Sequence, residues 1–217
     1  MKSKVVLFLK RFFLSLDKFT GSGDYWEKRY AQGGTSGAGS YGKYQEYKAS
    51  IINDFLDTHK VTSVIEFGCG DGNQLQDINY NNYIGFDVSR TTIDNCQSKF
   101  QGDAQKQFLH ISAFEKQKAA LAVSLDVIYH LVEDDVYFEY MNNLVASAQE
   151  YIIIFSSNTD KQKRFSRQHV KHRIFTLFFD KHPSWKLINT VKTPSRVSGA
   201  AERNVHIADF YIFKKVK

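Results

Sequence analysis

The chain has 217 residues, which is long enough for one enzymatic domain with a full core and too short for two. Hydrophobic residues make up 42% of it and only two prolines occur, so we expect a globular fold and exclude disorder except near the ends. The two cysteines cannot build a disulfide framework and no Cys or His pair has metal-ligand spacing, which favours a reducing cytoplasm and no metal. The formal charge of +6 is compatible with nucleic acid, an anionic membrane or a phosphorylated substrate as partner.

Residues 1–19 are predicted to form an amphipathic basic helix, because apolar residues recur at helical spacing with lysines and arginine between them. The apolar run from Val5 to Leu9 is cut by Lys10, so it is far shorter than the roughly 20 residues that cross a bilayer. No small-residue cleavage site follows it. Two interpretations stay open, a helix docked on the core or on the second subunit of a homodimer, and an in-plane helix in peripheral contact with a membrane.

Residues 24–48 are predicted to form a lid over a ligand, after a hinge at residues 21–23. The run from 33 to 42 has too many glycines for a core, but glycine turns mixed with aromatic and basic side chains can enclose a ligand. A flexible linker is the alternative. A helix is expected from Tyr44 to Leu56. The lid side chains that we expect at the ligand are Tyr25, Trp26, Arg29 and Tyr41.

The central motif is a short apolar run, Val64 to Phe67, that ends in the glycine-rich stretch Gly68-Cys69-Gly70-Asp71-Gly72. The run is typical of a strand buried on both faces of a parallel sheet. Glycines at its end allow a tight turn and bring bare backbone against a ligand. A second strand, residues 83–86, ends at Asp87, about twenty residues past Glu66, where an acid can accept both hydroxyls of a ribose.

This order of strand, acid, glycines, helix, second strand and terminal acid resembles the class I S-adenosylmethionine-dependent methyltransferases. The resemblance covers roughly residues 24–213. The run 124–134, with Ser156-Ser157-Asn158, is also similar to a bacterial group associated with surface-glycan gene clusters. The resemblance to class I methyltransferases implies a doubly wound α/β fold with a seven-stranded, mostly parallel sheet, and S-adenosylmethionine as the cofactor. The cofactor residues that it implies are Tyr25, Trp26 and Arg29 of the lid, together with Glu66, Gly68, Cys69, Gly70, Gly72, Asp87, Val88 and Asp126.

Three further strands are expected at residues 108–111, 121–125 and 151–155, with a short helix near 74–78 and another capped by Ser89. Many methyltransferases place an Asp just after the third strand to bind the adenine amine. This chain has Ser112-Ala113-Phe114 there, so we name Ser112 and Phe114 as cofactor contacts in its place.

Asp126 and His130 follow the fourth strand, at the sheet edge where ligands bind in open α/β folds. An unperturbed His has a pKa near 6.5, which suits it to take a proton from a hydroxyl, so we name both residues as catalytic. The alternative for His130 is packing beside the cofactor. Residues 133–135 are expected to begin the next helix rather than to hold a metal.

Residues 159–184 are predicted to be a basic insertion on the acceptor side, since the densest positive patch of the chain runs from Asp160 to Arg173. A planar guanidinium grips phosphate or carboxylate through two hydrogen bonds. A solvated helix face is the alternative. Two final strands are expected at residues 185–188 and 205–213, with a loop between them. The residues that we name for the acceptor are Tyr41, Asn158, His169, His172 and Arg173.

We therefore expect an N-terminal segment, residues 1–23, and a single methyltransferase domain, residues 24–217. The expected reaction is methyl transfer to a small polar acceptor, a sugar hydroxyl above all, in surface-glycan biosynthesis. A nucleic-acid methyltransferase is an alternative that the charge favours, but the chain has neither Asn-Pro-Pro-Tyr nor Pro-Cys for base methylation, so we expect no nucleic acid as partner. A non-catalytic binding protein of the same fold is a second alternative, against which the intact glycines and Asp87 argue.

Overall fold

The computed structural model describes residues 19–162, 167–194, 197 and 208–216. The predicted N-terminal helix therefore lies outside the described residues, except for Phe19, as does part of the predicted basic patch. Among the described residues, no helix is long and apolar enough to cross a membrane.

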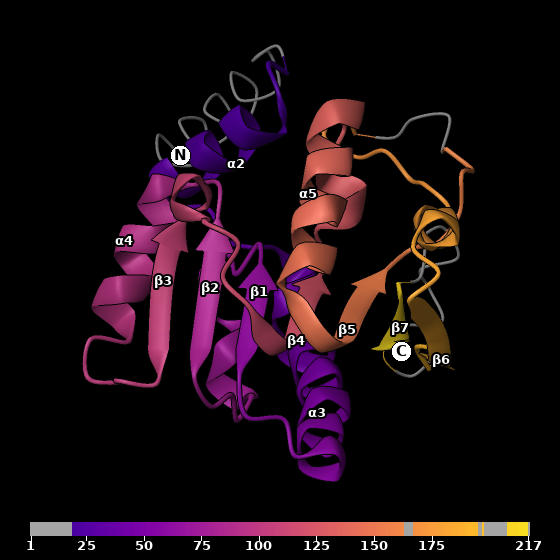
Figure 1. Ribbon diagram of the computed structural model, residues 1–217. Coiled ribbons are helices and arrows are strands. Elements are labelled where there is room, and N and C mark those ends of the chain that lie inside the picture. The colour runs from indigo at the N-terminus through magenta and orange to yellow at the C-terminus, as the bar shows by residue number, and fades with distance from the viewer. Residues whose placement is uncertain (1–18, 163–166, 195–196, 198–207, 217) are drawn as a thin grey trace, which may run out of the picture.

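The described strands form one sheet with the order β3-β2-β1-β4-β5-β7-β6 (Figure 1). Strands β1 to β5 pair in parallel, while β7 is antiparallel to both β5 and β6. This confirms the predicted doubly wound, mostly parallel α/β fold with seven strands. The strands are β1 (Val64–Phe67), β2 (Tyr83–Asp87), β3 (Lys106–His110), β4 (Ala119–Leu125), β5 (Ala148–Ser156), β6 (Trp185–Val191) and β7 (Asp209–Lys215).

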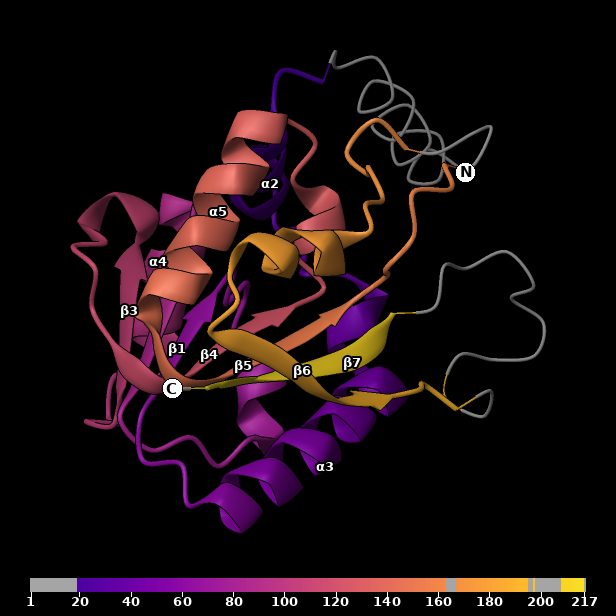
Figure 2. The ribbon, with the colours of Figure 1, turned by 45° about the vertical axis from the view of Figure 1, so that its right-hand side comes forward.

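Helices cover both faces of this sheet, so the fold has three layers (Figure 2). Helices α3 (Gly42–His59) and α4 (Arg90–Lys99) pack on one face, and α5 (Asp134–Ser147) with the 3-10 helix η5 (Phe175–Lys181) packs on the other. In β5, Ile153 belongs to the first core and Ile152 to the second, as expected for a strand buried on both faces. The remaining 3-10 helices are η1 (Ala38–Ser40), η2 (Gln74–Asp77), η3 (Ile111–Ala113) and η4 (Ile128–His130).

Helix α2 (Ser22–Ala31) lies across the carboxyl ends of the parallel strands (Figure 1). The Ser22 backbone N–H and hydroxyl donate to the Glu133 carboxylate at 2.7 and 2.5 Å. Farther along α2, Glu27 accepts from the Thr91 hydroxyl at 2.5 Å. Ser22, which lies within the predicted hinge at residues 21–23, is buried and is the first residue of α2, and the hinge itself stays a prediction.

Candidate active site

A cavity of about 330 Å³ lies at the carboxyl ends of β1, β2 and β4, bounded by α2 on one side and α5 on another. Its volume falls in the range of small-molecule sites. The edge of the sheet where it lies is the one where ligands bind in doubly wound folds. The predicted residues that line it are Trp26, Glu66, Gly68, Cys69, Gly70, Asp87, Val88, Asp126 and His130.

The glycine loop after β1 brings bare backbone to the cavity wall. Gly68 and Gly70 have φ angles of 80° and 57°, in the left-handed region that favours glycine. A Cβ on Gly70 would lie 2.3 Å from the Ser36 hydroxyl oxygen, and one on Gly68 would lie 2.4 Å from a methyl carbon of Val127. Only glycine therefore allows the loop to approach these neighbours so closely.

Two buried carboxyl groups stand behind this loop. Asp87 accepts hydrogen bonds from the backbone N–H of Gly70 at 3.0 Å and of Ser89 at 2.9 Å. Burial raises the pKa of Asp87 to about 6 and that of Glu66 to about 7. Glu66 accepts from the Tyr83 hydroxyl at 2.8 Å. Because each carboxylate oxygen can accept more than one hydrogen bond, Asp87 can still bind the hydroxyls of a sugar ring.

Asp126 is held from two sides at the end of β4. The Lys48 ammonium lies 2.8 Å from its Oδ2, and the Tyr129 hydroxyl donates to its Oδ1 at 2.8 Å. Asp126 has a φ of 61°, an unusual backbone conformation for a residue other than glycine, although Asp and Asn adopt it more readily than most. Lys48 is fully buried and lines the cavity beside Asp126. The site thus contains an ion pair that the sequence reasoning missed.

Among the described residues, Nδ1 of His130 has a hydrogen-bond partner and Nε2 has none. Its Nδ1 lies 3.0 Å from the carbonyl oxygen of His169, which can only accept, so Nδ1 carries the proton. The Trp26 ring meets the His130 ring edge-on at 4.9 Å, and the Tyr25 ring stacks on His169 at 4.1 Å. Burial lowers the pKa of His130. The imidazole is therefore neutral near pH 7, with its lone pair on Nε2.

Five residues named for the cofactor do not line the cavity. Arg29 donates through Nε to the Thr35 carbonyl at 2.6 Å, and the Ser112 hydroxyl lies 2.7 Å from Nδ1 of His110. The Phe114 ring packs edge-on against two core phenylalanines. Their roles at the cofactor stay predictions, as do those of Tyr25 and Gly72.

The basic residues named for the acceptor are engaged within the protein. The Arg173 guanidinium donates to the carbonyls of Leu131 at 2.5 Å and Val132 at 3.0 Å, and pairs with Asp134 at 2.7 Å. His172 is buried, with Nδ1 at 2.7 Å from the Ser157 hydroxyl. Neither residue lines the cavity.

The other acceptor candidates also lie outside the cavity lining. Tyr41 donates to Asp71 at 2.8 Å, and Asn158 donates to the Thr176 hydroxyl at 3.0 Å. His169 does not line the cavity but contacts two residues beside it, His130 and Tyr25. Binding of an acceptor by these residues stays a prediction.

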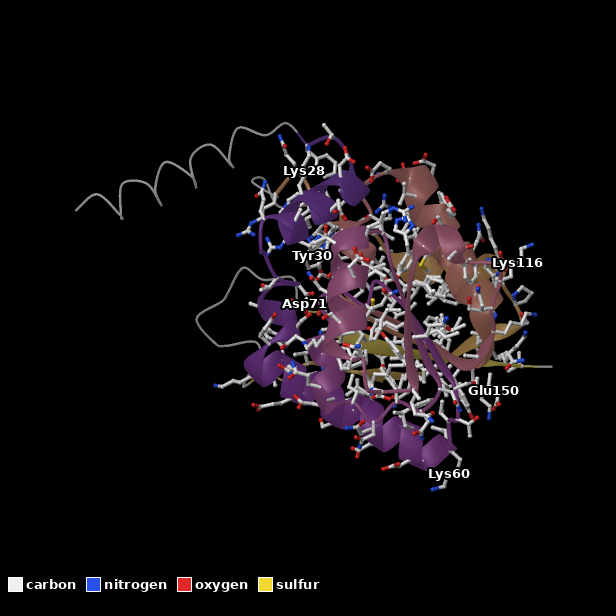
Figure 3. The ribbon with its side chains drawn as sticks, turned by 90° about the vertical axis from the view of Figure 1, so that its left-hand side faces the viewer. Lys28, Tyr30, Lys60, Asp71, Lys116 and Glu150 are labelled. Atoms are coloured by element: carbon white, nitrogen blue, oxygen red, sulfur yellow. The ribbon has the colours of Figure 1, made fainter. Side chains whose placement is uncertain are left out.

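Several lining residues were not anticipated, and two of them carried a signal in the sequence. Tyr30 follows Trp26 by four residues, so both project from one face of α2. Figure 3 shows Tyr30 below α2 at the same edge of the molecule as Asp71, far from Lys60 and Glu150 at the opposite end of the sheet. Lys48 interrupts the apolar stripe of α3 four residues before the buried Ile52. The unanticipated lining residues include Ser22, Tyr30, Ser36, Ser40, Lys48, Gln74, Glu139, Tyr140 and Asn143.

Solved structures share this fold at low sequence identity. The N-methyltransferase NodS from Bradyrhizobium japonicum WM9, in complex with S-adenosyl-L-homocysteine, superimposes with a TM-score of 0.67 at 13% identity, covering 91% of this chain and 100% of that one. The methyltransferase domain of bacterial CtHen1-C gives 0.62 at 13% identity, covering 81% and 100%. Magnesium protoporphyrin IX methyltransferase from Synechocystis PCC 6803, with bound S-adenosyl-L-homocysteine, gives 0.58 at 15% identity, covering 80% and 84%.

No curated protein matches the chain. A family model described as a methyltransferase domain matches residues 41–177, which include β1 to β5, the glycine loop, Asp87, Asp126 and His130. Because this match spans well over half of the chain and contains the cavity-forming strands, the protein belongs to the methyltransferase domain family.

Proposed function

We propose that this methyltransferase takes its methyl group from S-adenosylmethionine and transfers it to a hydroxyl of a sugar or another small polar acceptor, in the assembly of a surface glycan. When bound, the donor supplies an electrophilic methyl group on a sulfonium centre. The residues of the cavity suit it, because Asp87 can accept from ribose hydroxyls and the glycine loop offers bare backbone beside it. Trp26 and Tyr30 add aromatic surface from α2.

The observation that carries the proposal is the state of His130. A hydroxyl that becomes an ether must lose its proton, and a positioned base usually assists that loss. His130 lines the cavity with Nδ1 bound to the His169 carbonyl, so the Nε2 lone pair is free to accept a proton. The lowered pKa keeps this nitrogen unprotonated at neutral pH. An acceptor hydroxyl that reaches His130 would therefore find its base already in the neutral form.

The surroundings of the cavity support a small polar acceptor over a nucleic acid. Aromatic rings and serine hydroxyls on one wall suit a sugar, which has both apolar faces and polar edges. Nucleic-acid binding needs unpaired cations along the phosphate backbone. Lys171 and Arg173, from the predicted basic patch, both pair with Asp134, at 2.6 and 2.7 Å.

The test combines donor binding with methyl transfer. Calorimetry should show stoichiometric binding of S-adenosylhomocysteine, and a panel of nucleotide sugars, glycans and oligonucleotides should yield a methylated sugar. His130→Ala should lower kcat by roughly 10²- to 10⁴-fold while donor affinity stays nearly unchanged. His59→Ala serves as the control, because His59 is an exposed histidine at the far end of α3.

Each part of the proposal fails on a different result. Folded protein that binds neither donor nor product would defeat the use of S-adenosylmethionine. Methylation of oligonucleotides alone would defeat the sugar acceptor. Normal turnover of His130→Ala across the pH range would show that His130 only packs beside the cofactor.

A further inference from the structure

One residue of the cavity lining has a buried polar side-chain atom without a partner among the described residues. Gln74 begins η2, just after the glycine loop, and its side chain lines the cavity while only 6% of the residue is exposed. Its Nε2 donates to the backbone carbonyl of Gln45 at 3.0 Å. A carbonyl can only accept, so this contact identifies the nitrogen and leaves Oε1 as the other atom. Within the described part of the chain, Gln74 Oε1 has no hydrogen-bond partner.

Such an atom is uncommon in a folded protein, because leaving a buried acceptor unpaired is unfavourable. The other buried side-chain atoms without a partner among the described residues are Tyr80 OH, Thr92 Oγ1 and Ser156 Oγ. None of those residues lines the cavity. Gln74 Oε1 therefore points to a hydrogen-bond donor that the ligand brings with it.

The residues around Gln74 favour a cationic donor group. Gln45, which holds its amide, lies three residues before Lys48 on α3, so the two project from the same side of that helix. Among the described lining residues Lys48 is the one lysine or arginine, and its charge is already paired with Asp126. The Glu66 carboxyl completes this end of the cavity. It is thus rich in acceptors and has no unpaired lysine or arginine.

The opposite end of the cavity has a mostly apolar lining, although Glu139 lies one turn of α5 from Val136. Val88 follows Asp87 toward β3, and Ile111, Phe86 and Val136 line the wall there. A molecule whose ribose binds Asp87 would direct its flat, weakly polar base to this apolar end. Its charged amino-acid part would then lie on the side of β1, β4 and α3, where Gln74 is found.

We propose that the amide oxygen of Gln74 binds the α-ammonium group of the donor's amino-acid part. This rests on the proposed use of S-adenosylmethionine as donor. An ammonium carries three N–H donors and no acceptor, so it satisfies Oε1 without requiring any change in protonation. Gln74 is then a recognition residue that distinguishes the complete donor from adenosine compounds without the amino group.

Calorimetry with matched ligands and variants tests this assignment. The ligands are S-adenosylhomocysteine and its analogue in which hydrogen replaces the α-amino group. We expect wild-type protein to prefer S-adenosylhomocysteine by about 10- to 100-fold, the usual worth of a hydrogen bond to a charged group. Gln74→Met, which keeps the length and removes the acceptor, should lose most of this preference. Gln76→Met is the control, because Gln76 is exposed on the same 3-10 helix.

The outcomes separate this inference from the proposed function. If wild-type protein binds neither ligand, the donor assignment itself is wrong. If wild-type protein binds both and Gln74→Met keeps the full preference, Gln74 Oε1 binds only water and the inference is overturned. Gln74→Glu retains an acceptor oxygen, so this variant should keep the preference for S-adenosylhomocysteine or increase it. It also tests the inference if the methionine variant does not fold. Loss of the preference in Gln74→Glu would overturn the inference as well.

Discussion

Replacing Lys48 with methionine tests how far one buried ion pair stabilises the fold. Its side chain has no exposed surface, and its ammonium lies 2.8 Å from Asp126, whose side chain is 16% exposed. Removing one partner of a buried pair costs about 3–5 kcal/mol, because the other charge stays buried without compensation. We expect a loss near the lower limit, about 3 kcal/mol, since the Tyr129 hydroxyl still donates to Asp126 and some solvent reaches it.

Urea unfolding followed by circular dichroism measures this loss directly. For a domain of this size about 3 kcal/mol corresponds to a melting temperature lower by roughly 6–12 °C. Lys43→Met is the matched control, because Lys43 is exposed on the same helix and its replacement should change stability by less than about 0.5 kcal/mol. The double variant Lys48→Met/Asp126→Asn should recover much of the loss, since it leaves no unpaired charge. A Lys48→Met protein as stable as the Lys43→Met control would refute the reasoning.

Two further predictions concern Glu66 and Gly70. Burial raises the pKa of Glu66 from 4.5 to about 7, so over that interval the folded protein keeps a proton that the unfolded chain has lost. The free energy of unfolding of the wild-type protein should therefore fall as the pH rises from 4.5 to about 7. Glu66→Gln should abolish about 3 kcal/mol of that fall. If urea unfolding at pH 5 and at pH 8 gave the same change in unfolding free energy for both proteins, the prediction would be contradicted. Gly70→Ala should weaken S-adenosylhomocysteine binding and cost at least about 1–2 kcal/mol of stability, because its φ is 57° and its Cβ would lie 2.3 Å from the Ser36 hydroxyl oxygen. Gly102→Ala is the control, because its Cβ would meet nothing within 4 Å. Equal losses of stability and of S-adenosylhomocysteine binding in the two variants would contradict the close packing of the glycine loop.

The strands of the sheet centre were predictable because their residues are buried on both faces. Strand β1 begins at Val64 and β2 ends at Asp87, as the apolar runs predicted. At the sheet edges the signal is weaker. Strand β3 begins at Lys106, two residues before the predicted start, and β6 continues through Asn189 and Thr190 to Val191. Polar residues on exposed edge strands do not follow the apolar pattern from which strands are inferred.

The donor side of the site was easier to infer than the acceptor side, for a physical reason. Gly68, Gly70 and Asp87 owe their positions to the backbone of consecutive strands, which a local pattern reveals. The direction of a long basic side chain depends on partners far away in the sequence. Arg173 pairs with Asp134, 39 residues earlier, and no local pattern of charge indicates that contact.

Lys48 and Gln74 were missed for the opposite reason. Both are polar residues that a sequence pattern assigns to the surface, whereas the structure buries them against the cavity. Each is buried because a partner from another element accepts its hydrogen bond, Asp126 for Lys48 and the Gln45 carbonyl for Gln74. Such pairs become visible only when the elements are packed together.

The way in which α2 is attached has a consequence for the kinetics of ligand exchange. Only Ser22 and Tyr30 of this helix are buried, and hydrogen bonds through Glu27 and Glu133 join it to α4 and α5. An element with so few buried residues opens locally at a lower free energy than the strands beneath it. Because Trp26 and Tyr30 line the cavity, we expect a bound molecule to add contacts to this helix and to stabilise it in place. We therefore expect the residence time of a ligand to follow the local unfolding of α2, so that product could leave while the sheet stays folded.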